Sequence, residues 1–228
     1  SGVWSPATGL FRNAAATIPY VAGDTANCVF ARPTPNGVYP YTVTVQSLGF
    51  DVFSSFNNPA PITIPSVGTG TPYPSNITVS GLPATNAAVD NVILRGISHT
   101  WGDDIDILLQ SPTGQNVVLM SDVGGTVAVP NATYTFRDGA PAMAFGAANP
   151  TGTYSPTNNG ATDTWIAPGP GSVTQAAPAL ALFGSTANVN GVWKLFVVDD
   201  VGGDQGAIAG GWDITFRYPG PGCVSPVR

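Results

Sequence analysis

The chain has 228 residues, of which 43% are hydrophobic and only 9% are charged, and it contains 28 glycines and 22 prolines. The charged fraction is far below the roughly 25% of ordinary soluble domains, and a surface rich in hydroxyl and amide groups is typical of secreted, extracellular or cell-surface β-proteins. The net charge is −6. Scattered basic residues argue against nucleic acid as a partner, because a polyanion is bound by clustered Lys and Arg. No run approaches the length of a membrane span.

In chain order, residues 1–52 are predicted to form a small N-terminal β segment. Its stretch WSPATGLF is similar to Ig-like repeats of large secreted bacterial surface proteins, so we interpret it as a partial Ig-like piece. Residues 53–61, FSSFNNPAP, are predicted to be a linker. The main domain is expected over residues 62–218 and a C-terminal tail over 219–228.

The two cysteines, Cys28 and Cys223, are not in a CxxC pair, which excludes the usual zinc and thioredoxin-like motifs. One disulfide spanning almost the whole chain would fit, and so would two cysteines that pair elsewhere or stay reduced. The sequence leaves both alternatives open.

Runs of β-branched and aromatic residues, bounded by Gly, Pro, Asn and Asp, predict many short strands and almost no helix. In DIDILL, apolar and acidic residues alternate as in a half-buried strand, and SPTGQ at 111–115 reads as a turn. Many short strands joined by regular turns indicate an all-β sandwich or jelly roll. The predicted strands are 41–48, 75–81, 89–101, 104–112, 116–122, 191–200 and 211–218.

A Pro-, Gly- and Ala-rich excursion over residues 157–178 interrupts this pattern. Structureless loops of such length are uncommon and are usually either functional or disordered. Trp165 is the aromatic residue most open to exposure here, although packing over the sandwich is the better interpretation. Trp193 and Trp212 lie in alternating strands and are predicted to be core residues.

From residue 62 to residue 216 the chain resembles the P domain, or P/Homo B domain, which follows the catalytic domain of proprotein convertases and occurs in many secreted bacterial proteins. The motifs come in the family's order. They are ITIP, VILRGISHTWGDDIDILLQSPTG, TYTFRDGA, GTYSP and a closing block from LALFGS to GGWDITF. The chain departs from the pattern at Asp103, where the family has Gly, so Asp104 is the matching carboxylate. The excursion at 157–178 is also longer than in convertases.

The resemblance implies a jelly-roll β-sandwich of the galactose-binding-like type. It also implies a non-catalytic module that stabilises or targets the protein to which it is attached. The residues themselves agree with a non-enzymatic chain. His99 is the one histidine and hence the one candidate base of a triad, but no serine on a nucleophile elbow accompanies it. His99 is better interpreted as a buried, hydrogen-bonded residue at a strand end.

Ca²⁺ prefers six to eight oxygen ligands from carboxylates, carbonyls and water. Three acidic loops could bind it: WGDDID, which contains Asp103, Asp104 and Asp106, FRDGA with Asp138, and VDDVGGDQG with Asp199, Asp200 and Asp204. Some bacterial relatives of the family are calcium-binding sandwiches, so the resemblance also favours calcium as a cofactor. In an alternative interpretation, Asp104, Asp138 and Asp199 cap turns by accepting backbone hydrogen bonds, or Arg95 and Arg137 neutralise the loops. The expected ligands are first Asp199, Asp200 and Asp204, and then Asp103, Asp104 and Asp138.

The sequence thus predicts a non-catalytic extracellular β-sandwich module with a structural, stabilising or assembly role in a larger secreted or surface protein. Neighbouring domains or subunits would be its partners, and it could also bind a glycan or protein ligand. One alternative is a calcium-dependent adhesin or carbohydrate-binding domain. Another is the accessory domain of a secreted subtilisin-like protease.

Overall fold

The computed structural model describes residues 51–160 and 162–220, together with four two-residue strands in the first 31 positions. The chain divides into two units, one of Ser1–Val52 with Pro219–Arg228 and one of Phe53–Tyr218. The strands of the first unit pair antiparallel, β1 with β3 and β2 with β4. They are β1 (Gly2–Val3), β2 (Leu10–Phe11), β3 (Thr25–Ala26) and β4 (Phe30–Ala31). The predicted strand 41–48 and both cysteines lie outside the described residues.

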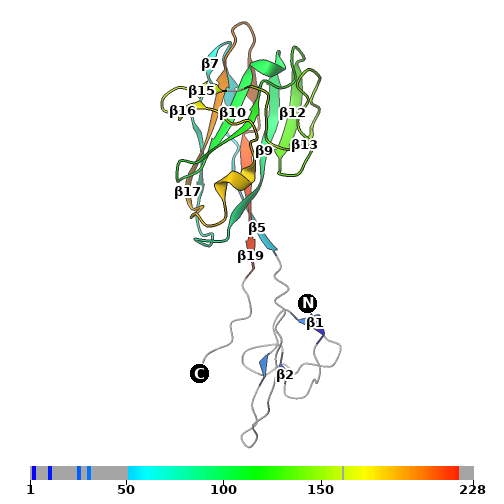
Figure 1. Cartoon of the computed structure of the whole chain (residues 1–228), viewed down its shortest axis with the longest axis vertical. Coiled ribbons are helices and arrows are strands. Elements are labelled where there is room, and N and C mark those ends of the chain that lie inside the picture. The colour runs from blue at the N-terminus through cyan, green and yellow to red at the C-terminus, as the bar shows by residue number, and fades with distance from the viewer. Residues whose placement is uncertain are drawn as a thin grey trace, which may run out of the picture. The chain divides into compact units, whose positions relative to one another are not determined.

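The unit Phe53–Tyr218 consists of two large β-sheets that face each other (Figure 1). The six-stranded sheet has the order β14-β11-β10-β17-β7, and β8 also pairs with β17. Its strands are β7 (Gly68–Thr69), β8 (Ser75–Val79), β10 (Ile105–Gln110), β11 (Asn116–Ser121), β14 (Thr157–Asn158) and β17 (Gly191–Asp199).

The seven-stranded sheet has the order β13-β12-β9-β18-β6, with β19 beside β9 and β5 beside β19. A short 3₁₀ helix, η1 (Gly102–Asp104), leads from this sheet into β10. The strands of this sheet are β5 (Asp51–Asn58), β6 (Ile62–Ile64), β9 (Ala88–His99), β12 (Val129–Phe136), β13 (Gly152–Tyr154), β18 (Gly206–Ile208) and β19 (Trp212–Pro219).

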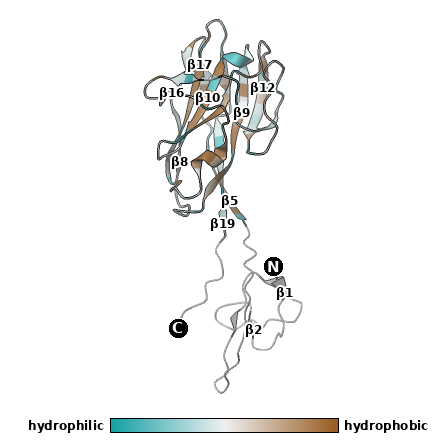
Figure 2. Ribbon diagram, in the orientation of Figure 1, coloured by the Kyte–Doolittle hydropathy of each residue, from teal (hydrophilic) through white to brown (hydrophobic). Residues whose placement is uncertain are grey.

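One hydrophobic core lies between the two sheets. Alternation along the strands sends every second side chain inwards, and the apolar colouring of Figure 2 follows the strands of both sheets. Trp193 and Trp212 are 1% and 0% exposed, which confirms that they are core residues. Trp193 packs edge-on against Phe183 of a second 3₁₀ helix, η2 (Leu180–Phe183). The all-β prediction is therefore confirmed.

The predicted linker at residues 53–61 was wrong over most of its length, because β5 occupies Asp51–Asn58 and pairs with β19. The Phe56 ring lies 6.0 Å from that of Phe216, edge to face. Hydroxyl groups add hydrogen bonds from Ser54 to Tyr218 and from Ser55 to Thr215, both at 2.9 Å. The Ser and Asn residues of this segment suggested a linker. However, among the described strands β5 pairs only with β19 and is therefore an edge strand, and edge strands tolerate polar residues because one of their sides is open to solvent.

The excursion at 157–178 is largely ordered. It begins with β14 and continues into an antiparallel hairpin of β15 (Asp163–Trp165) and β16 (Gly171–Val173). This β15–β16 hairpin forms a two-stranded sheet of its own. Trp165 is fully buried, so the structure confirms that it packs over the sandwich.

Within the described residues, no helix is long and apolar enough to cross a membrane.

Candidate metal centre

Eight carboxylates gather where β9 and β17 end and β10 begins, and we call this part of the sandwich the acid end. Electrostatic interactions link them into one network, in which Asp104 interacts with Asp103 and Asp199 while Asp106 interacts with Asp122 and others. The members of the acid end are Asp103, Asp104, Asp106, Asp122, Asp163, Asp199, Asp200 and Asp204.

Strand alternation divides the acid end into an inner and an outer group. Asp199 and Asp200 are consecutive at the end of β17, so their side chains leave the sheet on opposite faces. Asp199 is 0% exposed and meets His99 of the opposing sheet. Asp200 is exposed and interacts with Asp122 and Asp163 on the other face. The adjacent acids of the VVDD motif therefore belong to two different groups.

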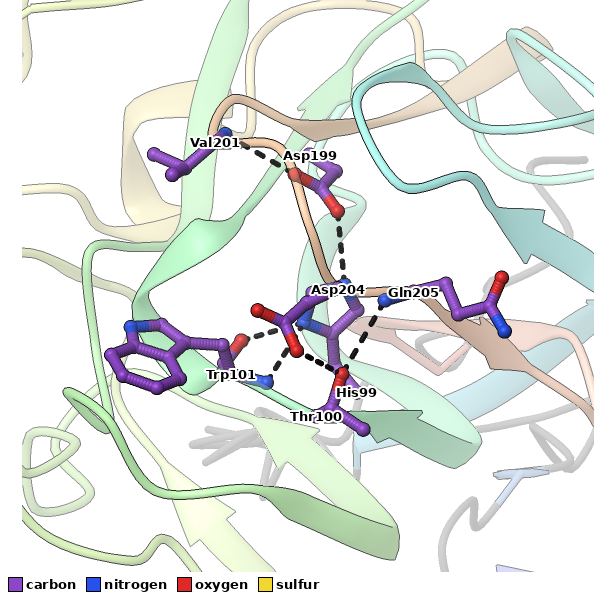
Figure 3. A network of polar contacts seen from close by, with 7 residues as sticks. All are labelled: His99, Thr100, Trp101, Asp199, Val201, Asp204 and Gln205. Atoms are coloured by element: carbon purple, nitrogen blue, oxygen red, sulfur yellow. Dashed lines mark hydrogen bonds and ion pairs between the residues drawn. The ribbon is translucent and has the colours of Figure 1, made fainter.

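The inner group is a set of hydrogen bonds around His99 (Figure 3). The Nε2–H group of His99 donates to Oδ2 of Asp199 at 3.1 Å, and neither side chain is exposed. The other carboxylate oxygen of Asp199 accepts the backbone N–H of Val201. His99 is therefore a buried, hydrogen-bonded residue at the end of β9, as its sequence context predicted. This pair joins the two sheets across the core.

Two more acids complete the inner group. Asp204 accepts a hydrogen bond from the hydroxyl of Thr100 at 2.5 Å. Asp104, in η1, is only 4% exposed, and burial together with the charges of Asp199 and Asp103 raises its pKa to about 6. The carboxylates of this group are thus held by hydrogen bonds or isolated by burial.

The outer group contains a cluster suited to a metal ion. One carboxylate oxygen each from Asp106, Asp122 and Asp163 lie within 4.8 Å of one another. Asp106 is in β10, Asp122 follows β11 and Asp163 begins the β15–β16 hairpin. The three residues come from separate segments that only the folded chain brings together. In the described part of the chain, this is the one such cluster of three His, Cys, Asp or Glu residues.

Burial makes the charge on this cluster costly. Desolvation, and then the charges of Asp163, Asp200 and Asp122, raise the pKa of Asp106 to about 8, although Ser121 opposes the shift. Burial and Asp163 also raise the pKa of Asp122. A cation between the carboxylates would reverse this effect, because an opposite charge favours the ionised form.

Unsatisfied oxygens face the same region. Asp106 is 4% exposed, and its Oδ1 atom is buried with no hydrogen-bond partner, as is Oδ1 of Asp103. Buried polar atoms in proteins are nearly always paired, so an unpaired carboxylate oxygen suggests a ligand. Carboxylate oxygens are hard donors, which Ca²⁺ and Mg²⁺ prefer. The residues therefore fit a hard divalent cation held by Asp106, Asp122 and Asp163, with Asp200 and Asp103 close by.

The six expected calcium ligands do not form one site. Asp199, Asp104 and Asp204 belong to the inner group, whereas Asp200 and Asp103 adjoin the outer cluster. Asp138 lies elsewhere, since its two oxygens accept the backbone N–H groups of Leu180 and Ala181 at 2.8 Å each and thereby cap η2.

Arg95 and Arg137 do not neutralise the acid end. Arg95 pairs with Asp213, and Arg137 pairs with Asp90 at 2.6 Å, so the alternative that assigned these arginines to the acidic loops was wrong. Lys194 lies in the middle of the six-stranded sheet, opposite Gln110. Within the acid end, the basic side chain that pairs with a carboxylate is His99, which meets Asp199.

Two of the three clustered residues were missed by sequence reasoning. Asp122 is the last residue of the predicted strand 116–122, but β11 ends at Ser121 and the φ of 51° at Asp122 places it in a left-handed turn. Asp163 stands in the excursion after NNGAT. An isolated Asp in a turn carries little signal, because Asp is common there for local reasons. Asp106 was recognised as part of an acidic loop, but not as a ligand.

The chain shows no significant similarity to any protein-family model, curated protein or solved structure in the comparisons made.

Proposed function

We propose that this chain is a calcium-stabilised, non-catalytic extracellular module of P-domain type, with a jelly-roll topology and a structural or assembly role in a larger secreted or surface protein. One observation carries the proposal. Asp106 is buried beside Asp122 and Asp163, one of its oxygens has no partner, and Arg95 and Arg137 pair elsewhere. Such an arrangement is stable when a cation supplies the missing charge.

Calcium is the cation that the arrangement favours. The ligands come from β10, from the turn after β11 and from the hairpin, so the ion would sit in an irregular cage of protein oxygens. Ca²⁺ accepts six to eight such oxygens in flexible geometry, whereas Mg²⁺ demands a near-ideal octahedron and retains several waters. The low charged fraction of the chain, typical of secreted β-proteins, fits a compartment where calcium is plentiful.

A calcium-dependent adhesin is the second candidate, and a specific observation favours it. Trp101 directly precedes η1 and is 38% exposed. Val127 and Phe145 are 37% and 49% exposed on neighbouring loops. Backbone contacts tie these loops together, since Gly102 donates to the carbonyl of Gly125. Exposed apolar side chains at one end of a domain are typical of binding surfaces.

Thermal unfolding in excess calcium and in excess chelator tests the proposal. An ion at about a hundred times its dissociation constant adds about 2.7 kcal/mol to the free energy of unfolding. For a chain of this size, we expect Tm to be about 5–10 °C higher in calcium. Asp122→Asn should remove most of this difference, because it deletes a charge from the cluster.

Asp204→Asn is the matched control. It removes a carboxylate from the acid end that belongs to the inner group, so the calcium-dependent difference in Tm should persist. Equal Tm values for the unmodified protein in calcium and chelator would refute the calcium site. A difference that disappears in Asp204→Asn but not in Asp122→Asn would move the site to the inner group.

A further inference from the structure

The β15–β16 hairpin covers the outer face of the six-stranded sheet, away from the main core. Its central anchor is Trp165, which packs with a second, smaller hydrophobic cluster. Tyr73 approaches from the side, and its ring lies 5.1 Å from that of Phe196, edge to face. The sheet residues beneath the hairpin come from β10, β11 and β17, and they are Leu108, Val118, Phe196 and Val198.

A side-chain amide ties the base of the hairpin to the edge of the sheet. Oε1 of Gln175 accepts the backbone N–H of Val118 at 2.8 Å, and its Nε2 group donates to the carbonyl of Asn116 at 3.2 Å. This amide thus pairs with β11 as a neighbouring strand would. At the turn of the hairpin, the hydroxyl of Tyr73 donates to the carbonyl of Ile166 at 3.1 Å.

The third contact between the hairpin and the sheet brings together side chains of like charge. Asp163, the first residue of β15, lies against Asp106 of β10 and against Asp122, which directly follows β11 of the same sheet. Asn158 donates to Asp163 at 3.1 Å, but the three carboxylates place oxygens within 4.8 Å of one another, so they repel when ionised. With the carboxylates ionised and no cation, this contact pushes the start of the hairpin away from the sheet, and a cation between them holds the hairpin in place.

The hairpin also has a cost in the docked position. The indole N–H of Trp165 is buried without a hydrogen-bond partner. An unsatisfied buried donor favours the exposed form, in which water can accept the hydrogen bond. The unpaired N–H of Trp165 and the repulsion at Asp163 both reduce the free-energy difference between the docked and the undocked hairpin.

We propose that the cation at Asp106, Asp122 and Asp163 is a latch that holds the β15–β16 hairpin on the sheet, and that its removal releases the hairpin and uncovers the apolar surface under Trp165. This inference rests on the calcium site proposed above. It adds that the ion controls access to a surface that the module otherwise keeps covered. A change in calcium concentration would thereby expose or hide a patch of apolar sheet.

Chymotrypsin cleavage after Trp165 provides the test, because Trp165 is the only aromatic residue between Tyr154 and Phe183. While Trp165 is buried, the Trp165–Ile166 bond is cut only when the hairpin opens, so the rate follows the open population. We expect cleavage in chelator to be about 10- to 100-fold faster than in calcium at a hundred times its dissociation constant. Mass spectrometry would identify the new end at Ile166.

Two variants sharpen the test. Asp163→Asn removes the charge that the hairpin contributes, so cleavage should be slow in chelator and should no longer respond to calcium. Asp204→Asn leaves the cluster intact and should keep the full calcium response.

The outcomes separate the latch from the site itself. If calcium raises Tm and binds by calorimetry while cleavage after Trp165 is equally fast in calcium and chelator, the latch is refuted and the site stands. If calcium neither binds nor raises Tm, both proposals fall. If cleavage is calcium-dependent in the unmodified protein and in Asp204→Asn, but not in Asp163→Asn, the latch is supported.

Discussion

Asp106 is the residue at which burial and charge oppose each other most directly. The folded protein keeps a proton on this side chain up to about pH 8, whereas the unfolded chain releases it near pH 4. Between these values the folded state binds more protons than the unfolded state. The contribution of Asp106 to the free energy of unfolding of the metal-free protein therefore falls as the pH rises from about 4 to 8, and is constant above that.

Calcium should reverse this dependence, because the ion binds the ionised carboxylate and displaces the proton. We expect the difference in Tm between calcium and chelator to grow from pH 5 to pH 8. Asp106→Asn should raise Tm in chelator at pH 8 and abolish the growing difference. Thermal melts at a series of pH values in both solutions measure this effect. Parallel curves in calcium and chelator would contradict it.

Single residues also mark what the sequence can and cannot predict about the site. The burial of His99, Trp193 and Trp212 follows from their places in alternating strands, and the structure confirms all three. The meeting of Asp122 with Asp163 could not be predicted, since it depends on where the excursion folds back over the sheet. Local pattern predicts the face on which a side chain lies, but not which distant segment will lie above it.

Among the elements, the strands with clear alternation were predicted within a few residues. β8, β10, β11, β17 and β19 all lie inside or at the edges of their predicted ranges. Several strands were missed, among them the long β12 and the short β7, β13, β14 and β18. The polar elements β5 and the β15–β16 hairpin were missed as well. Their stability comes from contacts with the sandwich, such as the packing of Phe56 on Phe216, and not from a periodic pattern of their own.

The edge of β11 supplies a prediction at this scale. Gln175→Ala should leave the N–H of Val118 and the carbonyl of Asn116 unpaired, which costs about 1–3 kcal/mol for a buried group. Hydrogen exchange at Val118 should accelerate accordingly. Gln115→Ala is the control, because the amide of Gln115 makes only a long contact of 3.4 Å to Leu182. Unchanged exchange at Val118 would show that the side-chain pairing is dispensable.

The N-terminal boundary of the folded unit can be tested by comparing the stabilities of two fragments. The unit Phe53–Tyr218 contains β5 from Phe53 onwards, so a fragment of residues 51–220 should unfold cooperatively and retain its calcium response. A fragment of residues 62–220, cut where the linker was predicted to end, loses β5 and uncovers Phe216. Loss of the whole strand, with the half-buried Phe56 and the pairing to β19, should lower the free energy of unfolding by about 3 kcal/mol or more. Denaturant unfolding of both fragments would reveal this loss, and equal stabilities would restore the linker interpretation.

The pairing of β5 with β19 also determines how the module would respond to force. Ser54 meets Tyr218 and Ser55 meets Thr215, so β5 advances along the chain while β19 returns, and the chain enters and leaves the unit through adjacent strands. Tension across these two points would separate the strands from one end, breaking one contact after another, and would leave the rest of the sandwich unloaded. The acid end lies beyond the far end of β9, where His99 pairs with Gly206, while Ala88 pairs with Arg217 at the near end. Under tension, the module would therefore unfold first at the end where β5 begins and β19 ends, while its metal centre stayed intact.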